Sequence, residues 1–257
     1  MKHTTQTNIR DRRLRNEEDG FTIIELLIAT AVFSLVLLII TYGVIHFTNS
    51  YYKGVNTSAT QATTQNAIES ISQAIEFSRN DGTSVTEVSP QSGSAGQPVP
   101  QGSNGYLCVG SKEFLFTLGQ KYDGGVPGSG SLGTDVGFYE LPQSTASCGW
   151  PSTWPNVSDG NELLSKNMRV TNLSVTPVSS ALGLWQISLG IAYGDSDLLC
   201  NVSKNTAQGG CAEGATQNNP STTPFVSGTD VRCTDTVGSQ FCAVANLSAA
   251  VTQRIGN

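Results

Sequence analysis

The strongest constraint on this chain is a long stretch without charge near its N-terminus. From Leu26 to Tyr52 the sequence contains no Asp, Glu, Lys or Arg, and residues 26–47 are almost wholly apolar. About 20 apolar residues in a helix suffice to span the hydrocarbon core of a bilayer. An arginine-rich segment, residues 10–15, precedes this stretch, which predicts that the N-terminus stays in the cytoplasm. We therefore expect a single-pass membrane helix, with the chain beyond it outside the cytoplasm.

Glu25 lies at the cytoplasmic edge of this stretch and needs an explanation. A secretory signal fits poorly, because its apolar region is shorter and ends at a cleavage site of small residues. A plain signal anchor fits the length but does not account for the acid. A carboxylate near the centre of a spanning helix costs about 2.5–3.5 kcal/mol, and less near the edge. We therefore expect Glu25 either to have a partner or to reach the headgroups.

The residues around Glu25 resemble the processing site of type IV pilin-like proteins. Residues 20–25 read GFTIIE and follow a short basic leader. In that family the leader is cut after the glycine, the new first residue is N-methylated, and the fifth residue is Glu. The resemblance implies cleavage between Gly20 and Phe21, N-methylation of Phe21 and an assembly role for Glu25. In the assembled filament Glu25 would face the Phe21 amine of a neighbouring subunit.

The same resemblance implies partners and a location. The partners are a prepilin peptidase that is also the methyltransferase, other pilin or pseudopilin subunits, and the membrane. The subunit would lie in the bacterial cytoplasmic membrane with its C-terminal domain extracytoplasmic, and after assembly in a surface filament or pseudopilus. Size and layout resemble minor pilins and pseudopilins of the PilW and GspJ type. Pilus, type II secretion and competence systems share this N-terminal chemistry.

A helical pattern continues beyond the membrane stretch. Apolar residues recur there at helical spacing, and no proline occurs before Pro90. Asn80-Asp81-Gly82 is a suitable stop signal. We read one helix from about Thr22 to about Arg79, whose second half packs on the outer domain. Its inward positions are predicted to be Val55, Ala59, Ala62, Ile68, Ile71, Ile75 and Phe77.

The rest of the chain reads as strands separated by long polar loops. Residues 106–109 and 113–118 predict a hairpin around Gly110-Ser111, and residues 184–193 alternate as a half-buried strand does. Other expected strands are 136–141, 168–178 and one from Phe241; expected loops are 83–105, 123–135, 145–161 and about 40 residues before the last strand. The prediction is an α+β fold: a long N-terminal hydrophobic helix packed on a C-terminal antiparallel β-sheet domain with disulfide-stapled loops. The predicted segments are leader 1–20, membrane or filament-core helix 21–47, amphipathic helix 48–80 and β-rich domain 81–257.

All six cysteines lie beyond the apolar stretch, which indicates disulfides in an oxidising compartment. The alternative, a metal site, is weakened by the lack of any Cys-x-x-Cys and by the presence of only two histidines, His3 and His46. Spacing suggests that the first two pair with each other and the last four among themselves. The six are Cys108, Cys148, Cys200, Cys211, Cys233 and Cys242.

No catalytic, cofactor or metal residues are predicted. Ser–His–Asp and Cys–His sites need a histidine, and His46 lies in the predicted membrane helix. The net charge of −6 argues against a nucleic-acid surface. Residues 159–162 and 195–197 could supply oxygen ligands to calcium, but acids in solvated loops are the preferred interpretation. The sequence thus favours a minor pilin or pseudopilin precursor that is not an enzyme. The alternative is a signal-anchored extracytoplasmic binding or adhesion domain that does not polymerise.

Overall fold

The computed structural model describes residues 21–78, 85–88, 104–124, 137–142, 160–179, 182–195, 198–201, 231–234 and 238–254. The chain divides into two compact units, Met1–Phe47 and Thr48–Asn257. The predicted α+β fold is confirmed: one long helix, α1 (Ile23–Phe77), is followed by antiparallel strands. The helix begins one residue later and ends two residues earlier than expected. Its predicted stop, Asn80-Asp81-Gly82, lies outside the described residues.

The first unit is the apolar part of α1. Its large hydrophobic side chains are exposed along the whole length, from Ile23 to Phe47, and α1 is long and apolar enough to cross a membrane. The hydroxyl groups of Thr30, Ser34 and Thr41 each donate to a backbone carbonyl three or four residues earlier, at 2.8–3.0 Å. In lipid a polar group has no water to bind, so these hydrogen bonds lower the cost of burying each hydroxyl. The first unit therefore suits an apolar solvent.

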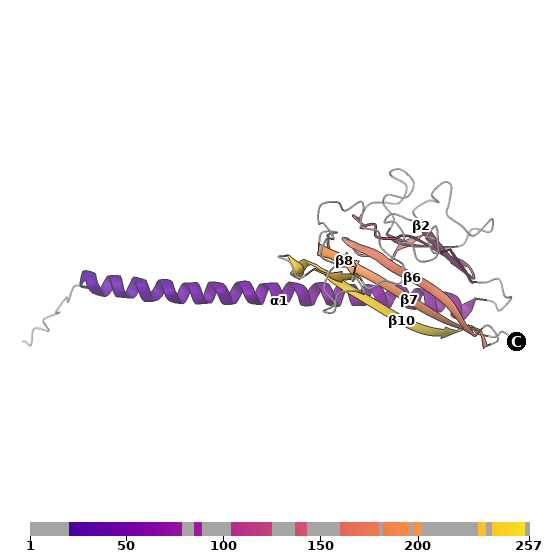
Figure 1. The fold of residues 1–257 in the computed structure, drawn as a ribbon, viewed down its shortest axis with the longest axis horizontal. Helices are drawn as coiled ribbons and strands as arrows, with labels where there is room; N and C mark the ends of the chain where they lie inside the picture. Colours follow the sequence, from indigo (N-terminus) through magenta and orange to yellow (C-terminus); the bar gives the residue numbers. More distant parts are fainter. Residues whose placement is uncertain are drawn as a thin grey trace, which may run out of the picture. The chain divides into compact units, whose positions relative to one another are not determined.

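The second unit contains the sheets. Among the described residues, strands join in the orders β1-β2-β3-β4-β5, β10-β7-β6 and β8-β9 (Figure 1). All of these pairings are antiparallel. The strand bounds are β1 Val85–Val88, β2 Asn104–Val109, β3 Lys112–Thr117, β4 Phe138–Pro142, β5 Asn161–Glu162, β6 Met168–Ser179, β7 Leu184–Tyr193, β8 Leu199–Asn201, β9 Val231–Cys233 and β10 Ala243–Thr252.

The second half of α1 and the two larger sheets share one hydrophobic core. Ile71 and Ile75 are fully buried and pack in the same cluster as Phe114 and Phe116 of β3 and Ile187 of β7. Figure 1 shows β6, β7 and β10 running beside this part of the helix. Alternate residues of β7, Ile187, Leu189 and Ile191, face this core, which is why the predicted alternation of residues 184–193 matches the strand.

Both ends of β10 are joined to α1. At one end, Asn56 donates from Nδ2 to the carbonyl of Gln240 at 3.1 Å. At the other end, Gln253 donates from Nε2 to Ser78 Oγ at 2.8 Å, and Arg254 forms an ion pair with Glu76 at 2.7 Å. The last strand therefore fixes the helix to the sheets over most of the second unit.

Four predictions about short segments were wrong. The expected loop 83–105 contains β1 and the first residues of β2, and the expected loop 145–161 runs into β5. The long segment before the last strand contains β8 and β9, which pair with each other, and Phe241 belongs to a short 3-10 turn rather than to the strand. Strands of two to four residues carry too little alternation to be recognised, because their pairing with distant residues decides whether they form.

The predicted inward face of α1 was right at its isoleucines and wrong elsewhere. Val55, Ala59 and Ala62 are exposed, and the buried line runs through Thr60 and Thr64 instead. These two threonines can be buried because each hydroxyl donates to the carbonyl four residues earlier, at 2.7–2.8 Å. Phe77 was also expected in the core but is 67% exposed, with the Arg254 guanidinium 4.9 Å from its ring centroid.

Candidate functional site

The start of α1 holds the residues of the predicted processing site. Phe21 and Thr22 precede the helix, and Phe21 is 84% exposed. Gly20 lies outside the described residues. The peptide bond on the N-terminal side of Phe21 therefore comes before the first helical residue, Ile23, rather than inside the helix.

Glu25 and Thr22 form a reciprocal capping box. The backbone N–H of Thr22 donates to Glu25 Oε2 at 2.9 Å, and the Thr22 hydroxyl donates to the same oxygen at 2.8 Å. In return, the backbone N–H of Glu25 donates to Thr22 Oγ1 at 3.3 Å. This is the arrangement expected of Ser/Thr-x-x-Glu at a helix N-terminus, where the first N–H groups lack helical partners. Sequence reasoning missed this role of Glu25, although the spacing of Thr22 and Glu25 signals it.

The capping box uses one of the two carboxylate oxygens of Glu25. In the described part of the chain, no donor reaches Oε1. A carboxylate accepts hydrogen bonds at both oxygens, so a cation can bind Oε1 without breaking the cap. The helix N-terminus also favours a negative charge at this position. The carboxylate is thus held in place within its own chain and remains able to take a second partner.

Comparison with known proteins gives one match, and it falls on this segment. Residues 15–41 match the prokaryotic N-terminal methylation motif. No curated protein and no solved structure matches the chain. The motif covers the end of the basic segment, the Gly20–Phe21 bond, the capping box and the first part of α1. It supports a type IV pilin-like precursor, processed by a prepilin peptidase and assembled with other subunits in a pilus or pseudopilus. The motif and the apolar helix together fit a membrane-anchored precursor.

The structure shows one complete disulfide among the described residues. Cys233 of β9 and Cys242, just before β10, are bonded, with Cα atoms 5.7 Å apart. Cys108 of β2 and Cys200 of β8 are disulfide-bonded as well, and both are buried. Cys148 and Cys211 lie outside the described residues. The Cys233–Cys242 bond has the form predicted from spacing, in which the last four cysteines pair among themselves.

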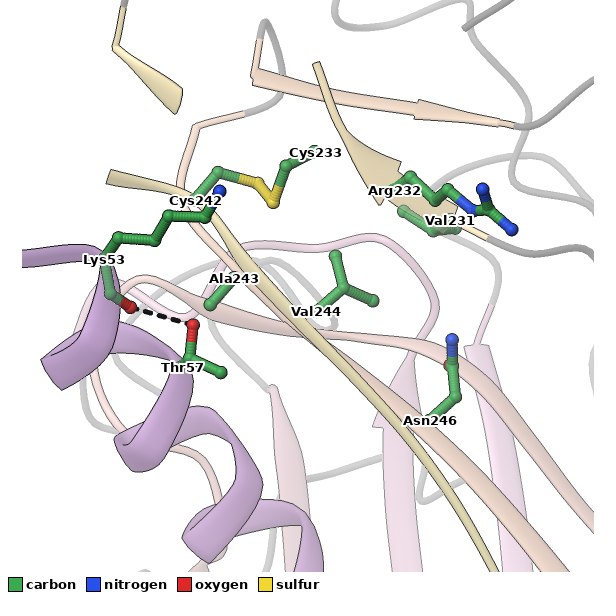
Figure 2. A pocket seen from close by; sticks show the side chains of 9 residues that line it. All are labelled: Lys53, Thr57, Val231, Arg232, Cys233, Cys242, Ala243, Val244 and Asn246. Atoms are coloured by element: carbon green, nitrogen blue, oxygen red, sulfur yellow. Dashed lines mark hydrogen bonds between the residues drawn. A yellow bond between two sulfur atoms is a disulfide. The ribbon is translucent and has the colours of Figure 1, made fainter. Parts of the chain in front are cut away.

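A cavity of about 380 Å³ lies beside this disulfide. Its lining comes from Lys53 and Thr57 of α1, from β9 and from the first residues of β10 (Figure 2). Lys53 and Arg232 are the charged residues of this lining, and the two cysteines are bonded to each other. The described lining offers no carboxylate or imidazole as a general base and no thiol as a nucleophile. Lys53 gives this lining a positive charge, which suits contact with an anionic group.

The acids considered as calcium ligands have other roles where they are described. Asp195 pairs with Lys121 at 3.0 Å. Glu162 accepts from the backbone N–H groups of Phe138 at 2.7 Å, Leu164 at 3.1 Å and Gly137 at 3.3 Å. Asp159 and residues 196–197 lie outside the described residues. Among the described residues, no group of three or more His, Cys, Asp or Glu side chains could hold a metal ion.

Burial gives Glu162 an unusual proton affinity. It raises the pKa of the Glu162 carboxyl to about 7, although its three backbone donors act in the opposite direction. Burial, aided by the Glu162 charge, also raises the pKa of Tyr122. The carboxyl group of Glu162 therefore links the start of β4 to the segment after β5 by hydrogen bonds and stabilises this part of the five-stranded sheet.

Proposed function

We propose that the chain is the precursor of a minor pilin or pseudopilin. It is cleaved after Gly20, methylated at Phe21 and incorporated through Glu25 into a type IV pilus or secretion pseudopilus, where it acts in assembly or priming. The proposal rests on the methylation motif in the exposed apolar part of α1, where the one acid, Glu25, is held at the helix N-terminus. The disulfide-bonded second unit is in keeping with an extracytoplasmic location.

Glu25 is the residue through which subunits would recognise one another. Cleavage would create a cationic amine at Phe21, and Glu25 Oε1 of a neighbouring subunit would receive it. Two charges attract far more strongly in an apolar filament core than in water. If one partner is removed, the other is left buried and unpaired at a cost of about 3–5 kcal/mol. The pair would therefore fix the register between subunits.

The capping box makes a simple Glu25→Ala test ambiguous, so a matched control is needed. Glu25→Ala removes both the cap and the charge. Thr22→Val removes the hydroxyl of the cap but leaves the carboxylate. We expect Glu25→Ala to lower incorporation into filaments about a hundredfold or more, as a cost of about 3–5 kcal/mol implies. Thr22→Val should lower it about fivefold at most, as a lost cap of about 1 kcal/mol implies.

The measurement is the amount of each variant in sheared or purified filaments, relative to its amount in the membrane fraction. Both variants should insert into the membrane as the unsubstituted chain does. Equal losses of incorporation into filaments in the two variants would show that Glu25 acts through its helix cap rather than through a contact between subunits. Normal incorporation of Glu25→Ala would refute the register role. The alternative function, an anchored binding or adhesion domain, predicts that neither change matters and that the leader remains attached.

A further inference from the structure

Three aromatic side chains form an exposed cluster at one end of the second unit. Tyr51 and Tyr52 of α1 and Phe241 of the 3-10 turn η4 (Ser239–Phe241) are 60%, 45% and 46% exposed. The Tyr51 and Tyr52 ring centroids are 6.1 Å apart, and the Tyr52 and Phe241 centroids are 5.7 Å apart. We call these three residues the aromatic collar. Exposed aromatic groups in contact with one another mark interaction surfaces more often than isolated ones do.

The fold holds Phe241 in this position. The Phe241 N–H donates to the Gly238 carbonyl at 2.8 Å, which closes the turn. Asn56 of α1 donates to the carbonyl of Gln240 at 3.1 Å, and the next residue, Cys242, is bonded to Cys233. Hydrogen bonds and a disulfide thus fix the turn against α1, although they leave the Phe241 ring in contact with solvent. Because the fold holds an exposed aromatic ring in a fixed position, we expect this surface to contact a partner.

The position of the collar along the chain indicates the partner. The charge-free stretch ends at Tyr51-Tyr52, and Lys53 is the first charge after it. Residues 26–47 are about as long as the hydrocarbon core is thick, roughly 30 Å, at about 1.5 Å per helical residue. The residues just after Phe47 then fall in the headgroup layer, about 5–8 Å thick on each side. Tyrosine is enriched at this depth, and lysine extends its ammonium group to the phosphates.

We propose that the aromatic collar rests in the outer headgroup layer of the membrane while the subunit awaits assembly. Tyr52 enters this layer by its place in the chain, and Phe241 enters it by its contact with Tyr52. Lys53 lines the neighbouring cavity and adds a positive charge beside the collar (Figure 2), which suits a surface of phosphate groups. The collar would fix the depth of the second unit at the bilayer. This inference rests on the membrane storage of the precursor in the proposed function.

The test uses the full chain in phospholipid vesicles and three tryptophan variants. Phe241→Trp reports on the collar. Phe33→Trp, in the middle of the apolar stretch, reports on membrane insertion. Phe77→Trp is the matched control, because Phe77 is an exposed phenylalanine of the second unit that lies outside the collar. The three native tryptophans give a baseline in the unsubstituted chain. Lipids brominated close to the headgroup or deep in the acyl chain serve as quenchers.

The collar predicts three distinct results. Shallow bromines should quench the added fluorescence of Phe241→Trp, deep bromines should quench that of Phe33→Trp, and neither should quench Phe77→Trp. The double change Cys233→Ser and Cys242→Ser removes the disulfide. It should weaken the quenching of Phe241→Trp by shallow bromines, because the turn is then less tightly held.

Two failures can be told apart. If Phe33→Trp is quenched but Phe241→Trp behaves as Phe77→Trp does, the collar is refuted and membrane storage stands. If Phe33→Trp is not quenched, membrane storage itself is refuted, and the collar with it. The tryptophan of Phe241→Trp could be shielded from solvent in filaments but not in vesicles. That result would assign the cluster to packing between subunits and would also overturn the proposal.

Discussion

At the scale of single residues, two acids are held by backbone N–H groups, with different consequences. Glu25 closes the first turn of α1 through Thr22 and keeps one oxygen for another partner. Glu162 accepts three backbone N–H groups and is partly buried within the sheet. The Thr-x-x-Glu spacing could have revealed the first role from sequence alone. The sequence does not signal the second, because two of its three donors, Gly137 and Phe138, are about 25 residues away in the chain.

Glu162 gives a pH dependence of stability whose sign follows from its pKa. The folded value of about 7 lies above the ordinary value of 4.5, so the folded state binds the proton more tightly than the unfolded chain does. The contribution of Glu162 to stability is therefore complete below pH 4.5 and is lost as the pH rises to 7. The slope reaches at most about 1.4 kcal/mol per pH unit.

We expect Glu162→Gln to flatten this slope, since glutamine does not ionise. The measurement is the free energy of unfolding of the second unit, within the full chain in detergent, between pH 4.5 and 8. Glu69→Gln, on the exposed face of α1, is the matched control and should leave the slope unchanged. Glu162→Gln can lower stability at every pH by losing the bond to Gly137, so the comparison concerns the slope. An unaltered slope in Glu162→Gln would contradict the raised pKa.

At the scale of elements, helices and strands with a long apolar repeat could be predicted from the sequence, and very short strands could not. Helix α1 and strands β6 and β7 repeat their apolar periods over ten or more residues, and each was predicted nearly to its ends. Strands β8 and β9 contain three residues each and form by pairing with each other. The inward face of α1 was misplaced before Ile68, since it includes Thr60 and Thr64, whose hydroxyls bond to the helix backbone.

We expect truncation of a buried side chain of α1 to lower the free energy of unfolding more than truncation of an exposed one. Ile71 is fully buried, so Ile71→Ala should lower the free energy of unfolding by about 2–5 kcal/mol. Val55 is 46% exposed, and Val55→Ala should change it by about 0.5 kcal/mol or less. Chemical denaturation of the full chain in detergent, followed by circular dichroism, measures both. Comparable losses for the two variants would mean that Val55 faces the core after all.

At the scale of the whole molecule, the two units suit two solvents. The first unit exposes apolar side chains, and the hydroxyls of Thr30, Ser34 and Thr41 bond to its own backbone, as lipid surroundings require. The second unit has its own hydrophobic core and disulfides. Charge and cysteine placement predict a membrane helix followed by an extracytoplasmic domain, and this division stays a prediction. The sequence could not predict the contact between Tyr52 and Phe241, because the two residues lie far apart in the chain.

The central claim is that residues 1–20 are a leader and that Phe21 begins the mature subunit. Mass spectrometry of the N-terminal peptide, from membranes of cells that contain the prepilin peptidase, tests it directly. We expect a mature chain that starts at Phe21 and carries one methyl group on its α-amine. A chain that retains residues 1–20 in those membranes would contradict it.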